Sequence, residues 1–139
     1  MKKKQPTLDD VLLFRMKQLI EPNGSLMPIE LNKEIPFNVK RTFFVMNVPD
    51  KNPRGLHSHY KTKQLIICLQ GSIDVILYDG NIEKTYNIEQ GDAIYIPNLI
   101  WDEQVYNSKE TILVSLCSTH YNIDDYIHNK EEFKTIKNG

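Results

Sequence analysis

The chain has 139 residues, 40% hydrophobic and 25% charged, which are the proportions of one ordinary globular domain spanning residues 1–139. Its formal net charge of −1 gives no electrostatic reason to bind nucleic acid. No apolar run reaches the roughly 18–20 residues that cross a bilayer, and no apolar signal-peptide core follows the basic residues 2–4. Cys68 and Cys117 lie within apolar stretches, so we expect two buried free thiols and a cytoplasmic protein.

Short apolar segments alternate with turn residues along most of the chain. The Glu21-Pro-Asn-Gly24 and Asp79-Gly-Asn81 sequences are strong turn signals. Strands are predicted at residues 11–16, 37–48, 65–69, 73–78, 82–88, 93–96 and 111–115. Only residues 122–136 break the pattern, with apolar residues at helical spacing after Asn122, a residue type that caps helices. The pattern predicts an all-β sandwich or barrel with a short C-terminal helix.

Two of the four histidines, His57 and His59, stand two positions apart just before the apolar strand at residues 65–69. On an extended chain this spacing places both imidazoles on one face. Such a pair suits either metal binding or proton transfer at neutral pH. It could also simply line a pocket.

The residues around this pair have a recognisable spacing. Gln64 follows His59 after four residues, and Gly71 closes the block; a second block runs from Gly91 through Pro97 to Asp102. These blocks resemble the two motifs of the cupins, small jelly-roll β-barrels. The resemblance implies a cupin fold for this chain.

In metal-binding cupins the four ligand positions hold three histidines and a glutamate. By position, this chain has His57, His59, Gln64 and Asp102 there. Gln64 lacks a charge, which lowers metal affinity, and this favours a metal-free site in which the imidazoles act as acid and base. Two histidines and Asp102 could still form a facial triad for ferrous iron, so the metal alternative stays open.

A narrower resemblance covers about residues 18–136. The segments Asn23-Gly-Ser-Leu26, Ile35-Pro-Phe-Asn-Val-Lys-Arg41, Pro53-Arg-Gly-Leu-His57-Ser-His59, Asp79-Gly-Asn81 and Asp124-Asp-Tyr-Ile127 resemble those of the nucleotide-sugar 3,4-ketoisomerases. That family converts dTDP-4-keto-6-deoxyglucose into a dTDP-3-keto-6-deoxyhexose, toward the 3-amino-3,6-dideoxy sugars of bacterial surface polysaccharides. The resemblance implies an isomerase without metal or other cofactor that forms homodimers by exchanging N-terminal strands.

The resemblance also implies roles for individual residues. His59 would move the proton between C3 and C4, and His57 would shuttle a proton between the oxygens. Arg41 and Arg54 would hold the diphosphate, a task for which guanidinium groups are well suited. Gln64 is a further candidate for substrate binding.

Two positions differ from those of relatives that form the galacto product. These relatives carry histidine and arginine where this chain has Asp102 and Asn23, so we expect the gluco product. Trp101, next to Asp102, is a candidate for shaping the sugar pocket or for packing in the core.

Three other functions fit the same residues. A nucleotide-sugar 3,5-epimerase would use similar proton abstraction but exchange the C5 proton as well. A sugar-nucleotide-binding cupin would bind dTDP without proton exchange. A metal-dependent oxygenase would contain iron.

Overall fold

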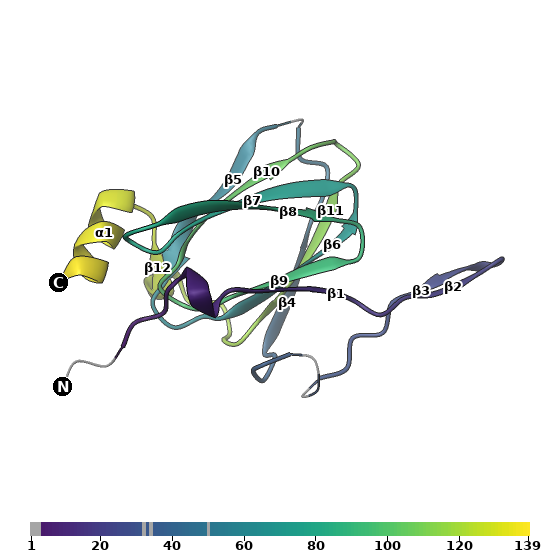
Figure 1. The fold of residues 1–139 in the computed structure, drawn as a ribbon, viewed down its shortest axis with the longest axis horizontal. Coiled ribbons are helices and arrows are strands. Elements are labelled where there is room, and N and C mark those ends of the chain that lie inside the picture. The colour runs from purple at the N-terminus through teal and green to yellow at the C-terminus, as the bar shows by residue number, and fades with distance from the viewer. Residues whose placement is uncertain (1–3, 32, 34, 50) are drawn as a thin grey trace.

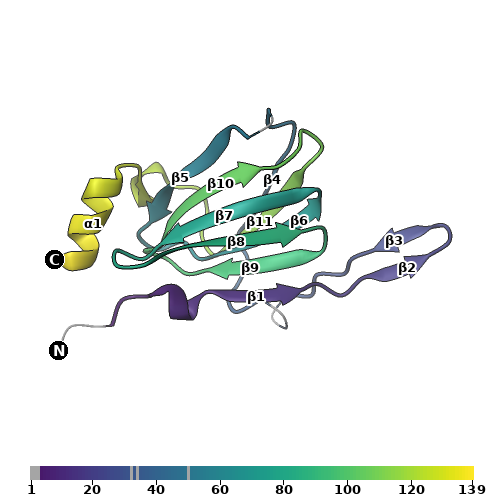
Figure 2. The same cartoon turned by 45° about the horizontal axis from the view of Figure 1, so that its top comes forward.

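Antiparallel β-strands are the main regular structure of the chain, as a computed structural model shows, so the all-β prediction is confirmed. The structure describes residues 4–31, 33, 35–49 and 51–139; residues 1–3 of the predicted domain lie outside this part. Two five-stranded sheets face each other (Figures 1 and 2). The first has the order β1 (Leu12–Arg15), β9 (Asp92–Ile96), β6 (Gln64–Gln70), β11 (Ile112–Cys117), β4 (Arg41–Val45). The second has the order β12 (Tyr126–Ile127), β5 (Pro53–His59), β10 (Trp101–Tyr106), β7 (Ser72–Tyr78), β8 (Glu83–Glu89).

The main core fills the space between the two sheets. Strand β7 contributes Ile73, Val75 and Leu77, which alternate with less buried residues as the sequence pattern predicts. Strand β6 is buried on both faces, because Leu65 and Ile67 pack in a second cluster on the outer side of its sheet. This two-sided burial explains why residues 65–69 read as an uninterrupted apolar run. Cys68 and Cys117 are buried free thiols, as predicted.

The two ends of the barrel differ. At one end the helix α1 (Lys130–Asn138) packs beside β12, and at the other a hairpin of β2 (Leu19–Glu21) and β3 (Gly24–Leu26) projects from the barrel (Figure 1). These two strands form a separate two-stranded sheet. No helix in the described part of the chain is long and apolar enough to span a membrane.

The predicted helix at residues 122–136 is partly wrong. Asn122 caps a short 3-10 turn, Ile123–Asp125, and the chain then extends into β12 along the edge of β5. The α-helix begins only at Lys130, where the Asn129 side chain accepts a hydrogen bond from the Glu132 amide. The predicted strand at residues 37–48 is also shorter, since regular pairing is confined to β4.

Candidate active site

A bulge in β5 sets the direction of the first histidine. His57 is the partner of Asp102 on β10 and Gly55 is the partner of Glu103, so Leu56 is an extra residue on β5. Gly55 and Leu56 both have positive φ angles, of 80° and 54°. Such bulges turn a strand and re-aim its side chains, and they are frequent beside active sites.

The two imidazole rings lie edge to face, with centroids 4.9 Å apart. His57 lines a cavity of about 390 Å³, whereas His59 lies deeper and is only 5% exposed. The ring of Tyr126 on β12 packs against both imidazoles, with its centroid 5.3 Å from that of His57 and 4.4 Å from that of His59. The spacing of two residues therefore brings the histidines into one site, as the sequence predicts.

His57 has a neutral ring with a defined orientation. Its Nδ1 lies 2.8 Å from the carbonyl oxygen of Gly55, which can only accept a hydrogen bond, so Nδ1 carries the proton. Burial lowers the pKa of His57, the hydrogen bond to Gly55 partly opposes this effect, and the nearby His128 lowers the pKa further. The Nε2 atom is then a hydrogen-bond acceptor at neutral pH.

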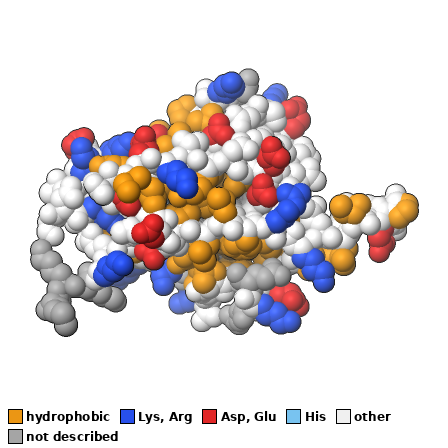
Figure 3. All heavy atoms as spheres, in the orientation of Figure 1, with side chains coloured by type: hydrophobic (Ala, Val, Ile, Leu, Met, Phe, Trp, Pro, Cys, Tyr) orange, Lys and Arg blue, Asp and Glu red, His pale blue; other side chains and the backbone are white. Residues whose placement is uncertain are grey.

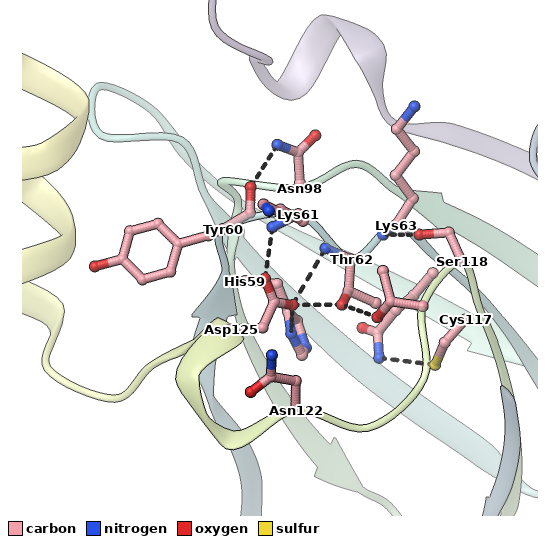
Figure 4. A network of polar contacts seen from close by, with 12 residues as sticks. His59, Tyr60, Lys61, Thr62, Lys63, Asn98, Cys117, Ser118, Asn122 and Asp125 are labelled. Carbon is pink, nitrogen blue, oxygen red and sulfur yellow. Dashed lines mark hydrogen bonds and ion pairs between the residues drawn. The ribbon is translucent and has the colours of Figure 1, made fainter. Parts of the chain in front are cut away.

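His59 has a carboxylate partner instead. Its Nδ1 lies 3.1 Å from Oδ2 of Asp125 (Figure 4). Burial and the neighbouring His57 lower the pKa of His59 to about 4, although Asp125 acts in the opposite direction. The Nε2 atom is buried and has no hydrogen-bond partner among the described residues. His59 is thus an unprotonated base with an unused lone pair.

Asp125 accepts hydrogen bonds from the turn that follows β5. Its Oδ1 accepts from the Lys61 amide at 2.8 Å, and its Oδ2 accepts from the amide and the hydroxyl of Thr62. Burial alone would raise the pKa of Asp125, but the donors from Thr62 and Lys61 and the interaction with His59 together lower it. The carboxyl group is therefore ionised beside His59.

The cavity beside His57 has basic, polar and aromatic walls. The predicted residues Arg41, Arg54 and Gln64 all line it. The Arg41 guanidinium lies 5.6 Å from the centre of the Tyr121 ring, and its Nε is buried without a partner in the described structure. Two guanidinium groups in one cavity with a histidine can bind an anionic ligand. A larger groove of about 820 Å³, lined by Lys4, Lys61 and Lys63 among others, contains neither histidine.

Asp102 points into the barrel as part of a polar row on β10. Tyr106 donates to Gln104 at 2.9 Å, and Gln104 donates to Oδ2 of Asp102 at 2.9 Å, while Oδ1 is buried with no partner among the described residues. Burial raises the pKa of Asp102 to about 7, against the lowering effect of the Gln104 hydrogen bond. Gln104, which the sequence did not single out, lines the cavity, whereas Asp102 is not among the residues that line it.

Two further residues predicted to bind substrate also lie outside the cavity lining. Trp101 is buried against Phe133 of α1, with ring centroids 5.9 Å apart, and its indole N–H donates to Glu103. Asn23 lies on the exposed turn of the β2–β3 hairpin. Neither residue is among those that line the cavity in this chain.

Three residues near the histidines were missed because their segment reads as a helix. Asp125 hydrogen-bonds His59, and Tyr126 packs against both histidine rings. The ring of His128 stacks on Tyr126, with centroids 5.5 Å apart, and its centroid lies 6.4 Å from that of His57. The sequence pointed to this region only through Asp124-Asp-Tyr-Ile127, one of the segments that carry the family resemblance. Among the described residues, no three or more His, Cys, Asp or Glu side chains are grouped to hold a metal ion.

Two facing antiparallel sheets around a cavity with paired histidines define a cupin-type enzyme of jelly-roll architecture. The model of the family described as "FdtA: WxcM-like, C-terminal" matches residues 9–138. A curated relative from Aneurinibacillus thermoaerophilus, TDP-4-oxo-6-deoxy-alpha-D-glucose-3,4-oxoisomerase, is 36% identical over 123 residues, or 88% of each chain. The chain belongs to this family of nucleotide-sugar 3,4-ketoisomerases.

Solved structures agree with this assignment. The sugar 3,4-ketoisomerase QdtA from Thermoanaerobacterium thermosaccharolyticum, in complex with TDP, has a TM-score of 0.89 and 32% identity over 95% of this chain and 97% of its own. A 3,4-ketoisomerase from Helicobacter canadensis has a TM-score of 0.89 and 30% identity over 94% of this chain and 98% of its own. A histidine-to-asparagine variant of QdtA has been solved in complex with TDP-4-keto-6-deoxyglucose.

Proposed function

We propose that this enzyme converts dTDP-4-keto-6-deoxyglucose into a dTDP-3-keto-6-deoxyhexose, toward 3-amino-3,6-dideoxy sugars. The observation that carries the proposal is a pair of neutral histidines in contact, next to a cavity with two arginines. The QdtA variant bound to the same 4-keto sugar supports the choice of substrate.

The reaction needs only proton transfers. His59 takes the proton from C3, and the electrons of the C–H bond form a C3–C4 double bond while the C4 carbonyl becomes an enolate oxygen. His57 moves a proton from the C3 oxygen to the C4 oxygen, and His59 returns its proton to C4. The C3 hydroxyl becomes a ketone and the C4 ketone becomes a hydroxyl, so no redox cofactor or metal is required.

The arginines supply the binding energy away from the reacting carbons. In this proposal Arg41 and Arg54 bind the diphosphate, since their guanidinium groups offer paired donors to phosphate oxygens. Gln64 lines the same cavity and can hydrogen-bond the sugar. Trp101 contributes by packing rather than by contact, given its burial against Phe133.

We propose the gluco configuration at C4 of the product. Asp102 faces the barrel interior opposite His57, at a position where galacto-forming relatives carry histidine. A different side chain beside the oxygen-side histidine alters how the sugar ring is held when C4 is reprotonated. Asn23, the second departure from those relatives, lies on the projecting hairpin and would reach a site only in another subunit.

We also propose a homodimer in which the N-terminal strands are exchanged. In the single chain, β1 pairs with β9 of its own sheet, whereas the β2–β3 hairpin extends beyond the barrel. Leu19, Ile20 and Leu26 on this hairpin are 46%, 76% and 57% exposed, and Figure 3 shows apolar side chains on it. Apolar residues so exposed on a projecting element favour burial against a second copy.

Incubation with dTDP-4-keto-6-deoxyglucose in deuterated water tests the function. We expect deuterium to replace the C3 proton and a 3-keto product to accumulate, with no loss of activity after chelation. In product made in ordinary water, a large coupling between the C4 and C5 protons would establish the gluco configuration. The absence of exchange, while a known isomerase is active alongside, would overturn the proposal. Exchange at C5 as well would indicate an epimerase, and dTDP binding without exchange would indicate a binding protein.

A further inference from the structure

One carboxylate collects the hydrogen-bond donors around the buried histidine. Four donors converge on Asp125: Nδ1 of His59, the Lys61 amide, and the amide and hydroxyl of Thr62 (Figure 4). All four come from residues 59–62, the end of β5 and the turn after it. The Asp125 side chain is only 10% exposed, so water does not replace these contacts easily.

We propose that Asp125, held in place by Thr62, is the positioning residue that fixes the tautomer and orientation of His59. The proposal rests on the proposed function of His59 as the base at C3. An ionised carboxylate can only accept hydrogen bonds, so its contact with Nδ1 requires the ring proton to be on that atom. The lone pair of His59 is then on Nε2, the nitrogen that has no partner within the described part of the chain.

The network fixes the direction of each hydrogen bond. The Thr62 hydroxyl donates its single proton to Asp125, so at its contact with Thr119, 2.6 Å away, it accepts. Thr119 follows the end of β11, while Asp125 lies in the 3-10 turn of the C-terminal segment. The Tyr60 amide also donates to the backbone carbonyl of Asp125 at 2.9 Å. Rotation of the Asp125 carboxylate would leave several buried donors unpaired, which is unfavourable.

The same network distinguishes the two histidines. When His59 takes a proton, the imidazolium forms 3.1 Å from an ionised carboxylate and the pair is neutral. If His57 took that proton, its Nδ1 would face only the carbonyl dipole of Gly55. A charge-assisted hydrogen bond is roughly twice as strong as a neutral one. Asp125 therefore favours His59 over His57 as the carbon-side base.

Asp125→Asn, with Asp124→Asn as the matched control, tests this role. Asp124 is an exposed neighbour of the same charge on the same turn. We expect kcat to fall about 100-fold or more in Asp125→Asn, as is typical when a catalytic histidine loses its carboxylate, while KM changes less than about threefold. The acid limb of kcat/KM moves to lower pH, because the carboxylate raises the basicity of His59. Asp124→Asn behaves as the wild type.

A nuclear magnetic resonance measurement separates positioning from folding. In the wild type, the ¹⁵N shift of His59, assigned with His59→Asn, shows an unprotonated Nε2. In Asp125→Ala the protonated form of Nε2 becomes populated. We expect Thr62→Val to have a lower kcat than the wild type. Thr62→Ser, which keeps the hydroxyl, should retain the wild-type kcat.

Three results would overturn the proposal: a kcat within twofold of the wild type in Asp125→Asn, an unchanged His59 tautomer in Asp125→Ala, or equal activity of the two Thr62 variants. The tautomer is measured without substrate, so it remains informative if the wild type fails to isomerise the sugar. In that case, a His59 tautomer that changes in Asp125→Ala still supports the positioning role, although the proposed function has failed.

Discussion

Gly55 packs directly against the backbone of Asp102, on the neighbouring strand β10. A Cβ atom at Gly55 would lie 2.9 Å from the carbonyl oxygen of Asp102, and the φ angle of Gly55 is +80°. The same glycine accepts the hydrogen bond from Nδ1 of His57. The bulge that aims His57 therefore depends on the absence of a side chain at this position.

Gly55→Ala should destabilise the protein and displace His57. We expect a loss of about 2 kcal/mol or more in the free energy of unfolding, from the strained φ angle and the contact with β10. Denaturant unfolding measures the loss. Gly24→Ala is the matched control, since Gly24 has a φ angle of +141° but no atom within 4 Å of the added Cβ. Equal losses in the two variants would show that the close approach to Asp102 is unimportant.

His59→Asn should abolish exchange of the C3 proton, because asparagine cannot act as a base. We expect the rate of deuterium incorporation to fall by about 10³-fold or more, while calorimetry gives a Kd for dTDP within a few fold of the wild type. His120→Asn is the control, as His120 is exposed and lies outside the cavity. Substantial exchange in His59→Asn would assign the base to another residue.

Arg41→Ala and Arg54→Ala should weaken dTDP binding. Each guanidinium removed from a phosphate contact costs about 1.5–3 kcal/mol, so we expect Kd to rise about 10- to 100-fold. Titration calorimetry at two salt concentrations measures the change. Lys109→Ala, which removes an exposed positive charge distant from the cavity lining, should leave Kd unchanged. An unaltered Kd in both arginine variants would remove them from the diphosphate site.

Asp102→Asn should stabilise the protein at neutral pH but not at acidic pH. The pKa of Asp102 is about 7 when folded and near 3.8 when unfolded, so the folded state holds an extra proton between these values. Stability contributed by this group is therefore lost as pH rises from about 4 to about 7, on the order of 2–4 kcal/mol. Urea unfolding of both proteins at pH 5 and pH 8 measures the difference. The titration of His59 contributes equally to both proteins, so it drops out of the difference in their unfolding free energies. A difference that does not change with pH would contradict the prediction.

Ile20→Asp should convert the proposed dimer into a monomer. The side chain is 76% exposed on the projecting hairpin, and a buried carboxylate in an apolar interface is strongly unfavourable. Sedimentation equilibrium gives the mass of each protein. Ile82→Asp, at an exposed apolar residue outside that hairpin, is the control. If the wild type sediments as a monomer, the dimer itself is wrong.

Much of the barrel could be predicted from local patterns, but β10 could not. Its inward-facing residues, Asp102 and Gln104, are polar, so the alternation that marks a half-buried strand is absent. Gln104 donates to Asp102, accepts from Tyr106 and lines the cavity, so polar contacts take the place of apolar packing on this strand. A polar site inside a barrel removes the hydrophobic signal from the strand that forms it.

The sequence by itself determined the all-β class and the shared site of His57 and His59, because strand periodicity and spacing are local properties of the chain. Arg41 and Arg54 were expected from the family resemblance. Only the tertiary structure decided the partner of His59. Residues 122–127 have helical spacing, but the free edge of β5 offers backbone hydrogen bonds that draw Tyr126 and Ile127 into a strand. This long-range pairing brings Asp125 to a histidine 66 residues away, a contact that no local pattern encodes.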